Sequence, residues 1–174
     1  SPQSFEYSTL GGWVATRSSG HFSMGYGRIE ALYHGGEVVT PTGRMELPAH
    51  PASAAGPDLK EVILGSEGRL GVITTCRMKV TPLPRLEQFR GAFLPSPEAG
   101  RTAVREIVQA NVPLAMMRLS LPTETRTSLV LGGSGLTMKL LDAWLAVNRL
   151  GDDKVMLLYG AAGPRNRVRA SLAE

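Results

Sequence analysis

Hydrophobic and polar residues alternate most clearly over residues 72–80, where the sequence reads VITTCRMKV. Alternation with a period of two is typical of a strand that has one buried and one solvated face. The buried face would carry Val72, Thr74, Cys76, Met78 and Val80, and the solvated face Ile73, Thr75, Arg77 and Lys79. Cys76 is then expected to be a small buried side chain. Upstream, EVVT and RMEL flank a Pro-Thr-Gly turn at 41–43, which predicts a β-hairpin.

Helical signals occur at two places with recognisable first turns. Residues 57–64, PDLKEVIL, are expected to form a short helix with Pro57 at its first position, and to end at Leu64 and Gly65. Ser96 is placed to cap another helix that has Pro97 in its first turn. The apolar stripe of that helix would consist of Ala103, Val104, Ile107 and Val108.

Pro82 and Pro84 bar continuation of both helix and sheet, so this segment is expected to separate two parts, residues 1–84 and 85–174. The second part is predicted to contain strands at 89–94, 115–121 and 154–159. Helices are predicted at 123–131 and 137–150 and at the end of the chain, with a glycine-rich break at 132–135. Strands and helices in this order predict an α+β fold with helices on one face of a sheet.

Composition narrows the class of protein. With 43% hydrophobic residues among 174, the chain can bury a core. No apolar run approaches the roughly 20 residues of a membrane-spanning helix, and no signal peptide is visible. The net charge is +4, but the basic residues are dispersed and the cluster Arg165, Arg167, Arg169 has no aromatic residues between its members, so nucleic acid is not expected as a partner. One cysteine and three histidines, without the spacing of zinc ligands, predict no metal site.

Glycine and hydroxyl side chains are concentrated in residues 4–27, with an echo, GSEGRLGVIT, at 65–74. Glycine lets main-chain N–H groups approach a ligand closely, so the first segment is expected to form a loop built against a flat, polar or phosphorylated group. A glycine-rich surface loop is the alternative. The motifs GxGxxG, GxxxxGK[ST] and GxSxG are absent, so residue patterns alone reach no specific chemistry.

Three blocks carry a resemblance that goes further: STLGGWVATRSSG at 8–20, GYGRIE at 25–30, and GPDLKEVILGSEGRLGVITTCRMKVTPLP at 56–84. In this order they resemble the second half of the FAD-binding domain of vanillyl-alcohol-oxidase-type flavoproteins, and within that superfamily the alkyldihydroxyacetonephosphate synthase family. Residues 85–174 are similar, more weakly, to the start of that family's cap domain. The implied fold is α+β: the second half of a PCMH-type FAD-binding domain, followed by the start of a ferredoxin-like α+β cap domain.

The resemblance implies that FAD is the cofactor and that two stretches bind it, through main-chain donors and directed hydroxyls. The first stretch comprises Gln3, Ser4, Phe5, Glu6, Tyr7, Ser8 and Thr9 together with Thr16, Arg17, Ser18 and Ser19. The second comprises Glu67, Gly68, Arg69, Leu70, Gly71, Val72 and Ile73. The family pattern more often has Asp at the position of Gln3, so this chain lacks a charge there.

Arg118 lies in AMMRLSL, which resembles a family strand that carries an arginine important for activity. A planar guanidinium suits a phosphate-bearing substrate, whereas the alternative is a cation on the solvated face of a strand. The implied reaction exchanges the acyl group of acyl-dihydroxyacetone phosphate for a fatty alcohol, in ether-lipid synthesis, without net redox change at the flavin. Two other interpretations stay open: an FAD-linked D-2-hydroxyacid dehydrogenase or oxidase of the D-lactate or glycolate type, and a non-catalytic binding module.

The glycine-rich pyrophosphate loop and the later tyrosine and histidine motifs of the family have no counterpart here. The chain is therefore expected to be an internal piece of a longer enzyme, and to bind FAD weakly or not at all when alone. For the full-length protein a homodimer and a cytoplasmic location are expected. The strongly apolar helix predicted at 137–150 raises the hypothesis of a tunnel for a fatty chain or of peripheral contact with a membrane.

Overall fold

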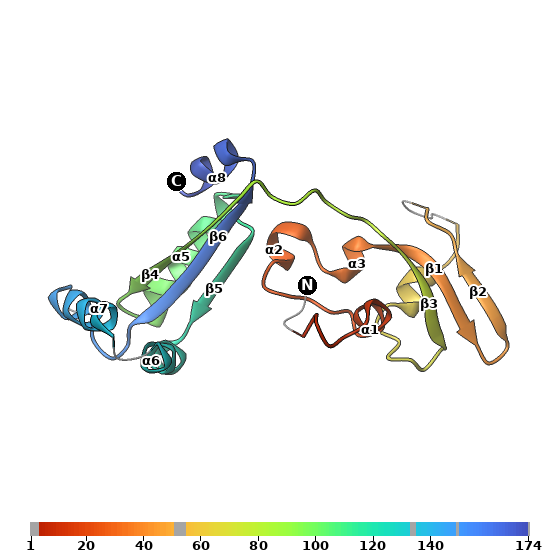
Figure 1. Ribbon diagram of the computed structural model, residues 1–174, viewed down its shortest axis with the longest axis horizontal. Helices are drawn as coiled ribbons and strands as arrows, with labels where there is room; N and C mark the ends of the chain where they lie inside the picture. Colours follow the sequence, from red (N-terminus) through yellow and green to blue (C-terminus); the bar gives the residue numbers. More distant parts are fainter. Residues whose placement is uncertain (1–3, 51–54, 133–134, 149, 174) are drawn as a thin grey trace. The chain divides into compact units, whose positions relative to one another are not determined.

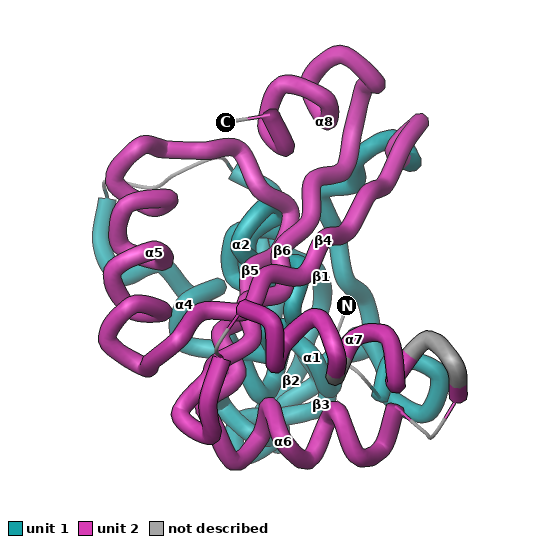
Figure 2. Tube along the Cα trace, turned by 90° about the vertical axis from the view of Figure 1, so that its left-hand side faces the viewer, with its two compact units in different colours: residues 1–83 teal, residues 84–174 magenta. Residues whose placement is uncertain are grey.

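The computed structural model describes residues 4–50, 55–132, 135–148 and 150–173. The chain divides into two compact units, Ser1–Leu83 and Pro84–Glu174 (Figure 2). Each unit has its own three-stranded sheet. The predicted loop at 50–56 and the predicted glycine-rich break at 132–135 lie partly outside the described residues.

Unit 1 begins with three short helices, α1 (Leu10–Ala15), α2 (Ser23–Tyr26) and α3 (Ile29–Leu32), of which the first two lie in the segment predicted to be a loop (Figure 1). α1 forms because Thr9 caps it, its Oγ1 accepting a hydrogen bond from Gly12 N at 3.1 Å, and because Val14 is fully buried. Tertiary burial thus outweighs the low helix propensity of Gly11 and Gly12. The prediction of a loop was wrong over α1 and α2.

The sheet of unit 1 has three antiparallel strands in the order β2-β1-β3: β1 (Tyr33–Thr40), β2 (Gly43–Leu47) and β3 (Val72–Met78). β1 and β2 form the predicted hairpin, in which Thr40 pairs with Gly43 across the turn. The hairpin prediction is confirmed.

β3 contains a β-bulge at Thr74, where its pairing with β1 shifts by one residue. The bulge places Ile73 against the core, together with Cys76 and Met78. Val72, which was expected inside, is 68% exposed. The predicted alternation is therefore correct from Thr75 to Met78 and wrong before the bulge, because a sequence pattern does not show a shift in register. It is also wrong at Val80, which lies beyond the end of β3 and is 85% exposed.

α4 (Leu59–Ile63) begins after Asp58, whose carboxylate accepts a hydrogen bond from Lys60 N at 3.0 Å. Pro57 thus precedes the cap and does not occupy the first helical position as expected. The helix ends at Leu64 and Gly65, as predicted. The core of unit 1 joins these elements through Val14, Ile29, Tyr33, Val38, Leu47, Ile63 and Leu64.

Unit 2 has a second three-stranded antiparallel sheet in the order β4-β6-β5: β4 (Leu86–Leu94), β5 (Met116–Ser120) and β6 (Val155–Gly163). The central strand is the last in sequence, and the crossover between the outer strands contains α5. This is the order of the first three strands of a ferredoxin-like fold, and the α+β class is confirmed. β4 starts at Leu86, earlier than the predicted Phe89.

α5 (Pro97–Gln109) is capped as predicted, with Ser96 Oγ accepting a hydrogen bond from Ala99 N at 3.2 Å. α6 (Pro122–Leu131) and α7 (Leu136–Val147) lie at the end of the sheet where β5 finishes and β6 starts (Figure 1). α8 (Arg165–Ser171) follows β6. Val108, predicted to lie in the apolar stripe of α5, is 53% exposed, because the helix contacts the sheet through the face that carries Ile107.

Within the described ranges, none of the helices combines the length and hydrophobicity that a membrane crossing requires.

Candidate functional site

The two glycine- and hydroxyl-rich segments lie side by side in unit 1. Glu67 N donates a hydrogen bond to Ala15 O at 2.9 Å, and Gly65 N donates to Val14 O at 3.1 Å. Both bonds join the segment after α4 to the end of α1. The structure therefore joins the end of α1, directly before residues 16–19, to the start of the second predicted stretch at Glu67.

Arg17 stabilises this junction with its side chain. Its guanidinium pairs with Glu61 at 2.7 Å, and its Nε donates to Leu64 O at 3.2 Å. Gly65 has φ 77°, which favours glycine, and a Cβ there would lie 3.1 Å from Arg17 Nε and crowd the Arg17 side chain. Arg17 and Glu67 themselves have φ of 49° and 51°. Positive φ is uncommon outside glycine and persists where surrounding contacts enforce it, often at functional sites.

The hydroxyl groups after α1 form a small network. Thr16 Oγ1 donates to Gly12 O at 2.9 Å and lies 2.8 Å from Ser18 Oγ. Ser18 N donates to Trp13 O at 2.9 Å, which turns the chain back over the helix. Ser19 is exposed, and within the described residues neither its hydroxyl nor its N–H makes a hydrogen bond. Ser19 can therefore donate to a ligand.

The segment before α1 is held by the indole of Trp13. Its Nε1 donates to Ser8 Oγ at 2.6 Å, and Ser8 Oγ donates to Ser4 O at 2.8 Å. Phe5 and Tyr7 are 52% and 93% exposed, and Glu6 is exposed too. Gln3 lies outside the described residues.

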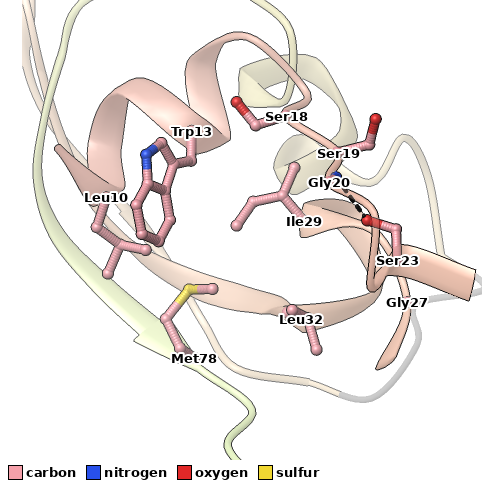
Figure 3. Close-up of a pocket in the computed structure, with 10 residues that line it drawn as sticks. All are labelled: Leu10, Trp13, Ser18, Ser19, Gly20, Ser23, Gly27, Ile29, Leu32 and Met78. Atoms are coloured by element: carbon pink, nitrogen blue, oxygen red, sulfur yellow. Dashed lines mark hydrogen bonds between the residues drawn. The ribbon is translucent and has the colours of Figure 1, made fainter. Parts of the chain in front are cut away.

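A cavity of about 130 Å³ opens beside α1 (Figure 3). One end is apolar, lined by Leu10, Trp13, Ile29, Leu32 and Met78, and the other carries Ser18, Ser19, Gly20, Ser23 and Gly27. Gly20 N donates to Ser23 Oγ at 2.9 Å at the polar end. The cavity is smaller than the roughly 300 Å³ at which pockets for whole small ligands begin, so it would take part of a larger ligand.

Most of this lining was not among the predicted site residues. The apolar members come from α1, α3 and β3, and from sequence alone each looks like an ordinary core position. Trp13 and Gly27 do fall in the blocks GGWVATRSSG and GYGRIE, which carried the resemblance without an assigned role for either residue. Membership of these blocks was the signal in the sequence that could have identified Trp13 and Gly27 as lining residues.

The second predicted stretch surrounds an open hollow after α4, lined by Val62, Gly65, Ser66, Glu67, Arg69 and Leu70. Within the described residues, the N–H groups of Gly68 and Leu70 make no hydrogen bond. Gly71 is half-buried and Val72 is exposed. Ile73 instead packs against the core and α1, where a Cβ on Gly11 would lie 3.4 Å from its own Cβ, so only its backbone could face a ligand.

Arg118 lies on β5 in unit 2, opposite Leu158 of β6. Met116 and Ser120, two positions away on the strand, share its face of the sheet. The Arg118 side chain is 42% exposed and forms an ion pair with Glu124 of α6. Arg118 is therefore a partly solvated cation on β5, paired with a carboxylate of the following helix.

Two ionisable groups of unit 1 lie in or against its core, Tyr33 and Cys76. Burial, with a smaller effect of the neighbouring Cys76, raises the pKa of Tyr33 to about 12. Burial also raises the pKa of the Cys76 thiol. A thiol that keeps its proton is a poor nucleophile, so Cys76 is not a candidate for covalent catalysis. Among the described residues, no three His, Cys, Asp or Glu side chains are grouped so that they could hold a metal ion.

Comparison with known proteins identifies the class of this site. The family of FAD binding domains matches residues 1–47, the part of the chain that contains α1 to α3 and the start of the first sheet. The fold is that of a PCMH-type FAD-binding protein with an α+β second unit, as predicted.

The chain is a homologue of alkyldihydroxyacetonephosphate synthases, which confirms the resemblance found in the sequence. It is 45% identical over 127 residues to the synthase of Dictyostelium discoideum, covering 73% of this chain and 21% of that protein. A solved structure of alkyldihydroxyacetonephosphate synthase superposes with a TM-score of 0.85 at 37% identity, covering 99% of this chain and 32% of that one. The glycolate oxidase subunit GlcD of Bacillus subtilis is more distant, at 28% identity over 130 residues, covering 70% of this chain and 27% of that protein. The chain thus spans between a fifth and a third of each of these three proteins.

The residues of unit 1 fit the cofactor that these comparisons indicate. FAD presents phosphate and ring oxygens, which need hydrogen-bond donors, and flat rings, which need apolar walls. Unpaired N–H groups at Ser19, Gly68 and Leu70 provide donors, and the apolar end of the cavity provides a wall beside Trp13. The site therefore combines the two kinds of surface that FAD requires.

Proposed function

We propose that this chain supplies one wall of the FAD site, and the phosphate-binding arginine, of an alkyldihydroxyacetonephosphate synthase. The enzyme would exchange the acyl group of acyl-dihydroxyacetone phosphate for a fatty alcohol. The observation that supports the proposal is the direct contact between residues 14–15 and 65–67, because it holds the chain next to residues 16–19 against the start of the second predicted stretch.

Each stretch has a distinct task in this proposal. The main-chain donors at Ser19, Gly68 and Leu70 would bind oxygens of FAD, and residues 4–9 would flank the cofactor, held in place by Trp13. When bound, FAD would supply a nucleophilic ring nitrogen and undergo no net redox change. Arg118 would bind the substrate phosphate, because its planar fork can donate two parallel hydrogen bonds to the oxygens and stays charged at any working pH.

The test is an exchange assay with the full-length protein that contains this chain. Incubation with acyl-dihydroxyacetone phosphate and a radiolabelled fatty alcohol is expected to give a labelled ether and release a fatty acid. Arg118→Lys, which keeps the charge and loses the fork, is expected to raise KM for the phosphate substrate about tenfold without changing FAD content. Flavin-loaded protein that shows no exchange would refute the proposal.

A redox enzyme of the same superfamily is the competing function, and the match to the glycolate oxidase subunit GlcD favours it. An enzyme of that kind would reduce its flavin with a D-2-hydroxyacid. Adding D-lactate or D-2-hydroxyglutarate to the full-length protein and following flavin absorbance separates the two. Under the synthase proposal the flavin stays oxidised, and bleaching would favour the dehydrogenase. Failure to retain either flavin or acyl-dihydroxyacetone phosphate would favour a binding module without catalytic activity.

We also propose that α7 makes peripheral contact with a membrane surface. Leu140, Trp144 and Val147 are 63%, 51% and 81% exposed on this helix, which suits a surface that delivers fatty substrates. Sedimentation of the full-length protein with phosphatidylcholine vesicles is expected to fall for Trp144→Ser and Val147→Ser. Val80→Ser, which removes an 85% exposed valine from unit 1, is the matched control and is expected to have no effect. Unchanged sedimentation of both α7 variants would contradict the proposal. The homodimer and the cytoplasmic location stay predictions.

A further inference from the structure

Arg118 does not stand alone on its strand, since its Nη2 is paired with Glu124 Oε1. The two side chains are 42% and 43% exposed. Arg118 belongs to β5 and Glu124 to the first turn of α6, so the ion pair links a strand to the helix that follows it.

The backbone that carries Glu124 is fixed to the sheet by the next residue. Thr125 is fully buried, and its hydroxyl makes two hydrogen bonds. Thr125 Oγ1 donates to Ser120 O at 2.9 Å and accepts from Met156 N at 3.1 Å. One side chain thus ties the start of α6 to both β5 and β6. The Glu124 carboxylate is consequently presented to Arg118 from a rigid anchor, as a positioned group must be.

The geometry of a guanidinium leaves room for a second anion. Arginine has five N–H donors, which form two edges capable of bidentate hydrogen bonds. Glu124 engages Nη2 alone, and within the described residues Nε and Nη1 of Arg118 make no hydrogen bond. A single acceptor on Nη2 occupies one edge at most, so one bidentate edge stays open for a phosphate.

We infer that Glu124 is a positioning residue for substrate binding: it holds the Arg118 guanidinium so that the open edge faces the phosphate. The inference rests on the proposed role of Arg118. An unrestrained arginine loses rotamer entropy when it is immobilised, and a carboxylate that orients it beforehand reduces this cost at the moment of binding. Nothing in the homology to synthases assigns this role to Glu124.

The experiment uses the full-length protein and compares Glu124→Ala with Glu124→Gln. Glu124→Ala is expected to raise KM for acyl-dihydroxyacetone phosphate about fivefold while kcat is unchanged. Glu124→Gln is expected to restore most of the affinity, because its amide oxygen can still accept from Nη2. Glu98→Ala is the matched control, because Glu98 forms an exposed pair with Arg101 on α5 in the same unit, and it is expected to leave KM unchanged.

A second set of variants separates this inference from the proposed function. In an Arg118→Ala background, Glu124→Ala is expected to cause no further rise in KM. If KM rises with Arg118→Ala but not with Glu124→Ala, only the positioning role is overturned. A lower KM for Glu124→Ala would also overturn it, because it would mean that the carboxylate repels the phosphate. No rise with Arg118→Ala would overturn the role of Arg118 and the inference with it. Thermal unfolding of each variant shows that a change in KM is not a loss of fold.

Discussion

Trp13 and Ser8 are joined by a hydrogen bond of 2.6 Å from the indole Nε1 to the hydroxyl Oγ. Ser8 in turn donates to Ser4 O at 2.8 Å, so two consecutive bonds fix the segment before α1 onto that helix. Trp13 also lines the cavity at its apolar end (Figure 3). One side chain therefore shapes the pocket and holds the neighbouring stretch of the proposed FAD site.

Replacing Trp13 by Phe should remove the donor and keep an aromatic ring in the cavity wall. The lost hydrogen bond is part-buried, so the free energy of unfolding is expected to fall by about 1 kcal/mol. Urea unfolding measures the change. Ser8→Ala should cause a loss at least as large, because it also removes the bond to Ser4 O, and the double variant should lose little more than Ser8→Ala alone, because both substitutions remove the bond between Trp13 and Ser8. Ser19→Ala, at a hydroxyl without a partner among the described residues, is the control. Fully additive losses would contradict the coupling.

Thr125→Val tests the anchor of α6. The substitution keeps the shape of the side chain but removes the hydroxyl that bonds Ser120 O and Met156 N, leaving a buried N–H without its acceptor. The free energy of unfolding is expected to fall by about 1–3 kcal/mol. Thr127→Val, at an exposed position on the same helix, is expected to change it much less. Equal effects of the two substitutions would show that Thr125 is no special anchor.

Signals that depend on a few neighbouring residues were predictable from the sequence. The cap of α5 needs Ser96 and Pro97, and the turn between β1 and β2 needs residues 40–43, so each could be recognised from a short stretch. The prediction that residues 16–19 and 67–73 belong to one site needed more than local signals, since it combined two distant segments of similar composition. The resemblance to a family, carried by ordered blocks, made that step possible.

Features that arise only on packing could not be predicted. The bulge at Thr74 depends on how β3 pairs with β1, and α1 forms in a glycine-containing segment because Val14 is buried. The cavity draws Leu10, Ile29 and Met78 from three elements, and each has the pattern of an ordinary core residue. The contact between Arg118 and Glu124 likewise crosses from a strand to a helix, which no periodicity in the sequence reveals.

Gly100→Ala should destabilise unit 2, although alanine normally favours a helix over glycine. The new Cβ would lie 2.8 Å from Val155 Cγ2 and 2.9 Å from Leu119 Cδ1, so these side chains or α5 itself must shift. The free energy of unfolding is expected to fall by about 1–3 kcal/mol, the usual cost of overpacking. Chemical denaturation provides the measurement, with Gly151→Ala as the control, because no atom lies within 4 Å of a Cβ at Gly151. A gain in stability from Gly100→Ala would mean that the packing of α5 against Val155 and Leu119 has room for a methyl group.

Tyr33 should make the stability of unit 1 depend on alkaline pH. Burial raises its pKa from 10.0 to about 12, so the unfolded chain loses the phenolic proton first as pH rises. Between those values the folded state binds more protons than the unfolded state, and stability is lost with rising pH, by at most about 1.4 kcal/mol per pH unit. Tyr33→Phe is expected to remove this contribution, and to be no less stable at neutral pH, because the buried hydroxyl has no hydrogen-bond partner among the described residues. Urea unfolding of both proteins at neutral pH and across the alkaline range measures the difference. Parallel curves for the two would show that Tyr33 titrates alike in the folded and unfolded states.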